Sequence, residues 1–553
     1  VLVQQAQEKN KTVQHMLPNI QTEGIREVDK VMDSLKLTVP QHVGKAIYPR
    51  CFSVARTAMS WVVDRLERFP PRKGPEWGSG GIFGLRFHRD VLYYTVAFDA
   101  ESHFIHRDSV KIYRFDKIGQ APRSGGDTYN AVETVDQYIY FGGWVNAPAI
   151  YQRMDNNTSK IVFLHKYSHV HEYDVDNMEV RLVWSESVHR EDEWAAEVGD
   201  ILYDPFNDKL FLMQEDGHFN NGVYRLDRRS GHVEQLFGEK CLKAALLRDM
   251  ACFAVGENYS EGLREFRFYD LVSKKLASFG LEGGSLDGSS YFKPSVGDVT
   301  SAYDRVFAFV RGGLFVGNPY LDERFTFVRL FDFHNFYAPF RTNSIIAGGG
   351  ILVPYNAHHD SVYQPITDEA KTYSRYTNTI TGPSVLIYIT PPVAKIVAAV
   401  GARITSVEKV ADKILLATDN SPNSGGPRVT PFDSGEKDFI VLNQEILQRP
   451  PPSAVFTVPF NNLPNFGEAF GTNCFGGIPL TGYRSPSLRF YASRDNVLTV
   501  NEYDLSLPLN PASTEHYIIR EGRNIIDLSS FTGIVSFKLE KFDAKALVRI
   551  NLV

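Results

Sequence analysis

The stretch GDILYDPFNDKLFLMQEDGHFNNGVYRLDRRSGHVEQL, residues 199–236, contains four short strand-like runs separated by turns. The runs at 201–203, 210–213, 223–226 and 232–236 are bounded by clusters of Asn, Asp, Gly and Pro, which is the pattern of consecutive hairpins. Four antiparallel strands in succession form one blade of a β-propeller. This stretch therefore predicts the fold and the place of a site, but it does not specify any chemistry.

The same pattern recurs about every 50 residues from residue 78 onward. Further repeats begin near residues 80, 126, 244, 297, 344 and 403, which gives seven blades, with five, six or eight as alternatives. The seventh repeat includes AVFTVP (454–459) as its last strand. Three repeats open on Gly-Asp, a pair that favours a turn or an inter-strand hydrogen bond. The fold class predicted is all-β, with a β-propeller over residues 76–460.

The two ends of the chain differ from the repeats. In residues 1–75, apolar side chains recur at helical spacing over 25–35, and a second helix is expected over 53–69. We expect an N-terminal helical extension that packs on the main body or mediates an oligomer contact. Residues 461–553 alternate in the manner of strands and predict a small C-terminal β-sandwich. The alternative is that these strands complete the propeller or pack against its side.

Composition excludes several classes of protein. A chain of 553 residues with 43% hydrophobic and 22% charged residues is typical of a soluble globular protein with two or three domains. The net charge of −6, without a basic stripe, argues against nucleic acid as a partner. No apolar run reaches the roughly 20 residues that span a bilayer. The four cysteines are too dispersed for a zinc cluster. Free thiols and the missing signal-peptide pattern favour a cytoplasmic over a cell-surface location.

Four segments carry a resemblance to a known family. EWGSGGIFG (76–84), PRSGGDTYNAV (122–132), YFGGWVNAP (140–148) and the blade at 199–236 together resemble an uncharacterised archaeal protein family of unknown function. The resemblance covers roughly residues 75–360. It implies an archaeal, thermophilic source, and it brings no catalytic residue with it.

Candidate acid–base residues follow from the geometry of a propeller. With the strands of a blade named A to D, the B–C loops and the D–A loops meet on one rim of the ring, where sites commonly form. Three carboxylates are expected on this rim: Glu101, Asp127 and Glu215. Paired carboxylates act on glycosidic bonds when one of them is kept protonated. The alternative, ordinary carboxylates in solvent-exposed loops, stays open for each of them.

Histidine close to a carboxylate recurs in the loops of three blades. The candidate metal ligands are His103, His218, His358, His359 and Asp360. Imidazole and carboxylate together suit zinc, iron, copper or nickel, so a divalent metal is the one cofactor that these residues suggest. The candidate ligand-binding residues on the same rim are Trp144, Asn146, Arg123 and Asn356, with Trp144 as a stacking platform for a sugar ring.

A second group of histidines lies in HKYSHVH, residues 165–171. His169 and His171 fall on one face of a regular strand, where they could chelate a metal as a pair. An exposed, polar strand face is the interpretation that the sequence favours.

Two functions remain in competition. The first is a non-catalytic binding or assembly protein that holds a protein or glycan partner on the rim. Aromatic residues make up 13% of the chain, and no catalytic signature of a known type is present. The second is a carbohydrate-active or metal-dependent enzyme with its site on the same rim. A fold that hosts many activities does not decide between them.

Overall fold

The computed structural model describes residues 82–553 apart from 97–99, 119–125, 147–149, 154–158, 163–165, 188–192, 257–261, 290–295, 322, 333–336, 340, 357–382, 420–436, 460–473 and 544. Within this part of the chain the regular structure is strands with a few 3-10 turns, and it contains no α-helix. The all-β class predicted from the sequence is therefore confirmed. The helices expected over residues 1–75, and the oligomer contact assigned to them, lie outside the described residues.

Seven antiparallel units follow one another in chain order and form blades one to seven, and one parallel strand pair joins the fourth and fifth units into a single eight-stranded sheet. Blade one contains β1 (Ile82–His88), β2 (Val91–Val96), β3 (Glu101–Ile105) and β4 (Val110–Arg114). Blade two contains β5 (Gly126–Asp127), β6 (Val132–Val135), β7 (Tyr138–Asn146), β10 (Lys166–Asp174) and β11 (Glu179–Ser187). Blade three contains β12 (Glu197–Asp204), β13 (Lys209–Glu215), β14 (Gly222–Asp227) and β15 (Val233–Phe237). A separate hairpin, β8 (Ile150–Arg153) and β9 (Ser159–Val162), leaves blade two.

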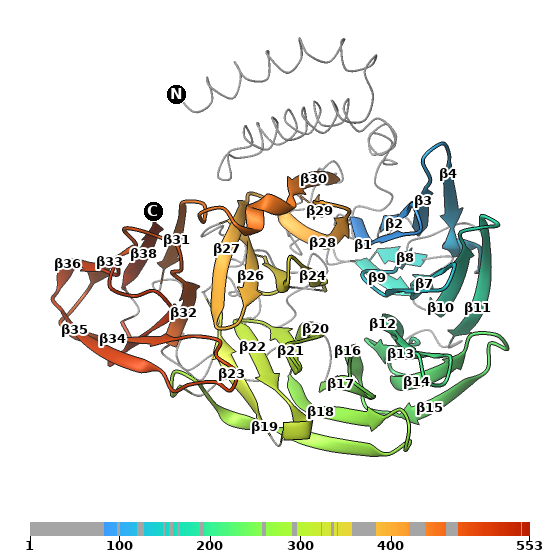
Figure 1. Cartoon of the computed structure of the whole chain (residues 1–553), viewed down its shortest axis with the longest axis horizontal. Coiled ribbons are helices and arrows are strands. Elements are labelled where there is room, and N and C mark those ends of the chain that lie inside the picture. The colour runs from blue at the N-terminus through green and yellow to red at the C-terminus, as the bar shows by residue number, and fades with distance from the viewer. Residues whose placement is uncertain are drawn as a thin grey trace, which may run out of the picture.

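The remaining blades continue the same order. Blade four contains β16 (Cys241–Leu247), β17 (Met250–Gly256), β18 (Leu263–Asp270) and β19 (Leu276–Ser285), and blade five contains β20 (Val296–Ala302), β21 (Arg305–Val310), β22 (Gly313–Gly317) and β23 (Phe325–Arg329). Blade six contains β24 (Ile345–Ala347), β25 (Gly350–Tyr355), β26 (Ser384–Thr390) and β27 (Val393–Val400). Blade seven contains β28 (Arg403–Val410), β29 (Lys413–Asp419) and β30 (Lys437–Asn443). The blades begin close to the repeat starts that the sequence indicates, and Figure 1 shows them arranged around a ring.

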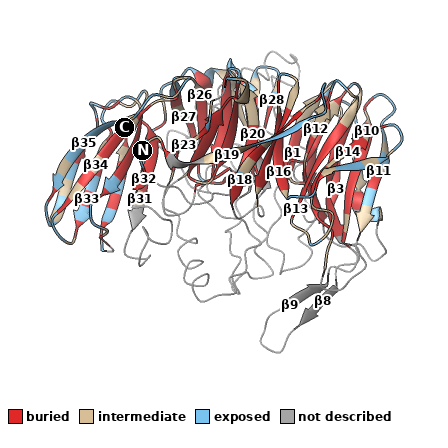
Figure 2. Ribbon diagram, turned by 90° about the horizontal axis from the view of Figure 1, so that it is seen from below, coloured by how far each residue is buried: buried red, intermediate tan, exposed pale blue. Residues whose placement is uncertain are grey.

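Hydrophobic side chains between consecutive blades hold the ring together. One cluster joins blade one to blade two through Phe104 and Phe141, and comparable clusters join each later blade to the next. A further cluster packs Tyr94 of blade one against Phe439 of blade seven and closes the ring. Because each blade is covered on both faces, its middle strands are buried on both sides (Figure 2).

Two of the three Gly-Asp pairs have a structural role that joins neighbouring blades. Gly199 and Gly297 are each the extra residue of a β-bulge in an inner strand. A Cβ at Gly297 would come within 2.6 Å of Pro339, which requires glycine there. The following aspartates accept hydrogen bonds from the next blade: Asp200 from Ala244 N at 3.2 Å, and Asp298 from Ser344 N at 2.6 Å.

The C-terminal region forms two further sheets packed face to face. One contains β31 (Ala454–Pro459), β38 (Leu547–Leu552), β33 (Ser487–Ala492) and β36 (Gly522–Asp527). The other contains β32 (Cys474–Pro479), β37 (Ile534–Leu539), β34 (Asn496–Tyr503) and β35 (Ser513–Ile519). The sequence assigned AVFTVP (454–459) to blade seven, and this was wrong, because β31 pairs with β38 instead.

A buried ion pair and a continuous core join this sandwich to the ring. Arg329 Nε donates to Asp287 Oδ2 at 2.8 Å, and Ser536 Oγ of the sandwich donates to the same oxygen at 2.9 Å. Tyr503 OH donates to the Arg329 carbonyl at 2.9 Å. Phe331 of the ring packs on Phe456 of the sandwich, in a cluster that takes in blades five and six. The two parts therefore share one hydrophobic core.

Candidate functional site

The two ends of the ring differ in the length of their connections. Strands A and B are joined by two residues at 89–90, 136–137 and 303–304. The B–C connections at the opposite end include 147–165, 356–383 and 420–436. We call the first end the turn face and the second the loop face. Long loops on a rigid ring are where binding residues concentrate, so the candidate site is sought on the loop face.

An aromatic–cation cluster lies where blades two and three meet on the loop face. It consists of Trp144, Lys166, Trp194 and His218. Lys166 Nζ lies 5.1 Å from the Trp144 ring centroid and 6.0 Å from that of Trp194, within the range of cation–π attraction. The Trp194 and His218 rings meet edge to face at 4.2 Å. Trp144 and Lys166 are buried, Trp194 is half-buried and His218 is exposed, so the accessible part of the cluster is Trp194 with His218.

One backbone carbonyl fixes the geometry of this cluster. The Asp216 carbonyl accepts hydrogen bonds from Trp194 Nε1 at 2.8 Å and from Lys166 Nζ at 3.3 Å. Backbone hydrogen bonds at 2.9 Å join His218 N to the Trp194 carbonyl, and Ala196 N to the Phe219 carbonyl. The loop after β13 is thereby held against the residues that precede β12.

Directly beside this cluster, two glutamates share one arginine. Arg341, in the connection between blades five and six, contacts Glu197 through Nη1 and Glu215 through Nη2, the latter at 3.4 Å. The Arg341 guanidinium also stacks 4.2 Å from the Tyr129 ring centroid. All three charged side chains are buried. The arrangement neutralises two buried carboxyls with a cation supplied from another part of the ring.

Burial raises the pKa of both Glu197 and Glu215, and of Glu215 strongly. The Arg341 charge lowers the pKa of each carboxyl, whereas the nearby Asp216 carboxylate raises it. One guanidinium opposes two buried carboxyls and a third acid nearby. Burial therefore favours the neutral form of each carboxyl, and the two carboxyls share the one guanidinium that opposes this effect.

Glu101 and His103 form a separate group on blade one. His103 Nε2 lies 3.3 Å from Glu101 Oε2, and the His103 ring stacks on Tyr94 at 4.7 Å. Glu101 also contacts Arg114. Both Glu101 and His103 are buried. Among the described residues, these contacts with Tyr94 and Arg114 lie within blade one.

Asn356 lies inside the ring, where both polar atoms of its side-chain amide form hydrogen bonds. Its Oδ1 accepts from Ile404 N at 2.7 Å, and its Nδ2 donates to the Ile404 carbonyl at 2.9 Å and to the Pro339 carbonyl at 3.2 Å. The side chain is completely buried. The structure thus gives Asn356 the role of joining blades six and seven, in place of the ligand-binding role that the sequence suggested.

The remaining candidates are described in part or not at all. Asp127 and Asn146 are the last residues of β5 and β7, and their side chains are not among those described. Arg123, His358, His359 and Asp360 lie outside the described residues. In the part of the chain that the structure describes, no three His, Cys, Asp or Glu side chains form a group suited to a metal ion. His103 and His218 sit in different blades with different partners.

The histidines of β10 correct an expectation. His169 and His171 are fully buried, not on an exposed strand face. Their Nδ1 atoms lie 3.1 Å apart, and His171 Nε2 lies 3.2 Å from Tyr113 OH. A strand with one solvated face would expose these rings, but a middle strand of a blade is covered on both faces by its neighbours.

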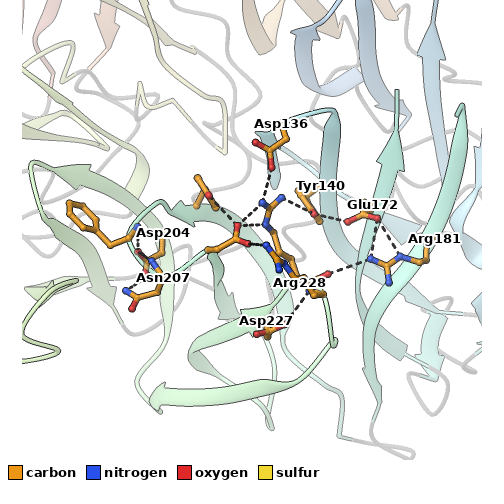
Figure 3. A network of polar contacts seen from close by, with 12 residues as sticks. Asp136, Tyr140, Glu172, Arg181, Asp204, Asn207, Asp227 and Arg228 are labelled. Atoms are coloured by element: carbon orange, nitrogen blue, oxygen red, sulfur yellow. Dashed lines mark hydrogen bonds and ion pairs between the residues drawn. The ribbon is translucent and has the colours of Figure 1, made fainter. Parts of the chain in front are cut away.

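A polar network on the turn face was not foreseen (Figure 3). Arg228 lies between blades two and three, where Nη2 donates to Asp136 at 2.8 Å and Nε donates to Asp208 at 2.6 Å. Tyr140 OH donates to Glu172 at 2.6 Å, and Arg181 binds the same carboxylate. Nearby, Asp204 and Asp227 each accept backbone hydrogen bonds from the second and third residues that follow them. The repeated Asp at strand ends was the available sequence signal, and it indicates turn structure.

Three solved structures resemble the chain at low sequence identity. The extracellular domain of a B. thetaiotaomicron protein described as a hybrid two component system is 14% identical over 51% of this chain and 32% of its own, with a TM-score of 0.31. This chain thus spans about a third of that one. The Dos1 propeller is 11% identical over 61% and 76% of the two chains, with a TM-score of 0.34. An exo-β-1,3-galactanase from Phanerochaete chrysosporium is 9% identical over 76% and 95%, with a TM-score of 0.27.

The sequence comparisons agree with the resemblance carried by the repeat motifs. No curated protein sequence matches the chain. A family model, by contrast, matches residues 92–427, which include strands from all seven blades. The chain belongs to the family described as uncharacterised proteins conserved in archaea, DUF2139.

Proposed function

We propose that this chain is a non-catalytic binding protein that holds a protein or glycan partner on its loop face. The observation that carries the proposal is the aromatic–cation cluster, in which Trp194 and His218 are accessible and are fixed by hydrogen bonds to Asp216 and Trp194. An aromatic anchor that is held rigid loses little entropy on binding. We also favour a cytoplasmic location, since the described cysteines are buried free thiols. The described part of the chain has no helix long and apolar enough to span a membrane.

The ion pairs formed by two of the acid–base candidates, Glu101 and Glu215, support binding over catalysis. Glu101 is engaged by Arg114 and His103, and Glu215 by Arg341. All of these carboxyls are buried, so a substrate would have to displace an internal cation to reach them. A buried ion pair of this kind serves to position its neighbours, and Arg341 lies beside the loop that carries His218.

The test is glycan-microarray binding by the full chain, with cross-linking to co-purifying proteins as the second arm. We expect the Trp194→Ala/His218→Ala variant to lose at least about tenfold in affinity for the partner found, because the accessible anchor is removed. The matched control is Phe206→Ala/Val272→Ala, which removes exposed apolar side chains from the turn face. Equal affinity of the two double variants for the partner would rule out the loop face as the binding surface.

The second candidate function is a carbohydrate-active or metal-dependent enzyme with its site on the same rim. The favouring observation is the raised pKa of Glu197 and Glu215 beside Trp194. It predicts turnover of chromogenic glycosides that Glu215→Gln abolishes while the fold is retained. Elemental analysis of the purified protein tests the metal-dependent version, because His358, His359 and Asp360 would then hold a stoichiometric ion.

A further inference from the structure

The outer face of the sheet β31–β38–β33–β36 is an exposed surface on the side of the sandwich turned away from its own core. Along β33 and β38 every second residue is buried, as in β33, where Leu488 and Phe490 point inward. The alternate positions carry large apolar side chains that remain exposed: Tyr491 (56%), Ile525 (61%), Leu547 (45%) and Val455 (40%). Scattered apolar residues are ordinary on a surface, but these lie on four adjoining strands.

Three arginines share this face with the apolar residues. Arg489 on β33 is directly opposite Arg549 on β38, and Tyr491 is flanked by Leu547 on one side and Arg523 on the other. All three arginines are exposed. We call this surface, made of the three arginines with Tyr491, Ile525, Leu547 and Val455, the arginine face.

The arginines of this face have no acidic partner among the described residues. Within the described ranges, neither an ion pair nor a hydrogen bond joins Arg489, Arg523 or Arg549 to another side chain. Asp527, an acid of β36 on the same face, accepts hydrogen bonds from Ser529 N at 3.0 Å and Ser529 Oγ at 2.9 Å. Like charges directly opposite one another destabilise a sheet. The Arg489–Arg549 pair is thus a cost to the isolated sandwich that a bound anion would remove.

We propose that the arginine face is a docking surface for an acidic protein segment with apolar side chains among its carboxylates. Arginine forks bind carboxylates in bidentate fashion, which accounts for the unpaired cations. Aromatic residues and arginine, with few Lys or Glu, are the composition of protein interfaces, which accounts for Tyr491 beside Leu547 and Ile525. A second copy in a symmetric, face-to-face dimer would bring arginines toward arginines. Nucleic acid is disfavoured by the net charge of −6.

The experiment measures binding of the full chain to three fluorescent polymers by anisotropy: a random copolymer of glutamate and tyrosine, poly-glutamate, and heparin. We expect the copolymer to bind most tightly, because it satisfies both the arginines and the apolar positions. Arg489→Ala/Arg549→Ala is expected to weaken copolymer binding about tenfold or more, and to reduce its dependence on salt. Tyr491→Ala is expected to remove the preference for the copolymer over poly-glutamate.

The matched control is Arg520→Ala/Lys538→Ala, which removes two exposed cations from other parts of the same sandwich. All of these positions are exposed, so the variants are expected to keep the parent melting temperature. Unchanged copolymer binding in the Arg489/Arg549 variant would overturn the proposal, as would equal losses in the control. Tighter binding of heparin than of either polypeptide would assign the face to an anionic glycan instead. Self-association lost in the same variant would assign it to a second copy of the chain.

Discussion

The two histidines of β10 show how one residue's surroundings set its chemistry. His169 packs against Phe115 and His171 stacks on Phe141, so neither ring reaches solvent. Burial lowers the pKa of His169 to about 3 and that of His171 well below its usual value. The neighbouring ring lowers the pKa of His171 further. Burial therefore favours the neutral form of both imidazoles in the folded blade.

Stability is therefore expected to depend on pH through these residues. In the unfolded chain each imidazole titrates near its ordinary pKa of about 6.5, while in the folded chain both stay neutral. As pH falls below that value the unfolded state binds more protons, so the free energy of unfolding declines, by at most about 1.4 kcal/mol per pH unit for each histidine. For His169 the decline ends near the folded pKa of about 3.

Urea unfolding between pH 7 and pH 4 checks this expectation. The His169→Gln/His171→Gln variant should show a shallower decline than the parent. His232→Gln, at an exposed turn position, is the matched control. Parallel pH profiles for the parent and the double variant would show that the buried pair does not titrate as argued.

At the scale of elements, the bulge with its following aspartate is the device that joins one blade to the next. Asp298→Ala would leave Ser344 N and Oγ without their acceptor. We expect a loss of about 2 kcal/mol in the free energy of unfolding, since hydrogen bonds to charged groups contribute about 1.5–3 kcal/mol. Asp298→Asn keeps an acceptor oxygen and should retain most of the stability. The exposed Asp412→Ala is the control, and a loss as large as that of Asp298→Ala would contradict the assignment.

Elements of this kind are also where the sequence was most informative. The Gly-Asp pairs, the turn residues 89–90 and the spacing of strands indicated the blades, because these signals are local in the chain. The partner of β31 could not be found in this way, because β38 lies almost a hundred residues away and AVFTVP alternates in the same manner in either sheet. Arg341 gave no local signal either. Its role arises only when closure of the ring brings the connection between blades five and six against blade three.

At the scale of the whole molecule, the buried Asp287–Arg329 pair decides whether ring and sandwich behave as one body. Asp287 accepts hydrogen bonds from Arg329, Ser289 and Ser536, and both ionic side chains are buried. Although burial opposes ionisation, the Arg329 charge and the serine hydroxyls hold the pKa of Asp287 below its usual value. The contribution of this aspartate is therefore present above the ordinary carboxyl pKa of about 4 and is lost as pH falls through the lower folded value.

Asp287→Asn tests the coupling, because it removes the charge while nearly preserving shape. Breaking a buried ion pair costs about 3–5 kcal/mol, and the retained contact of Arg329 with Asp332 places the expected loss near the lower end.

The five tryptophans all precede residue 200, so their fluorescence reports no change in the sandwich directly, whereas circular dichroism reports both parts. In the parent, the two urea transitions should coincide, because the shared core makes unfolding cooperative. In Asp287→Asn the dichroism transition should begin first, as the sandwich separates from the ring. Asp495→Asn, at an exposed ion pair with Arg520, should leave the transitions coincident. Coincident transitions in Asp287→Asn, with the parent's midpoint, would show that the hydrophobic contacts around Phe331 and Phe456 couple the two parts without this ion pair.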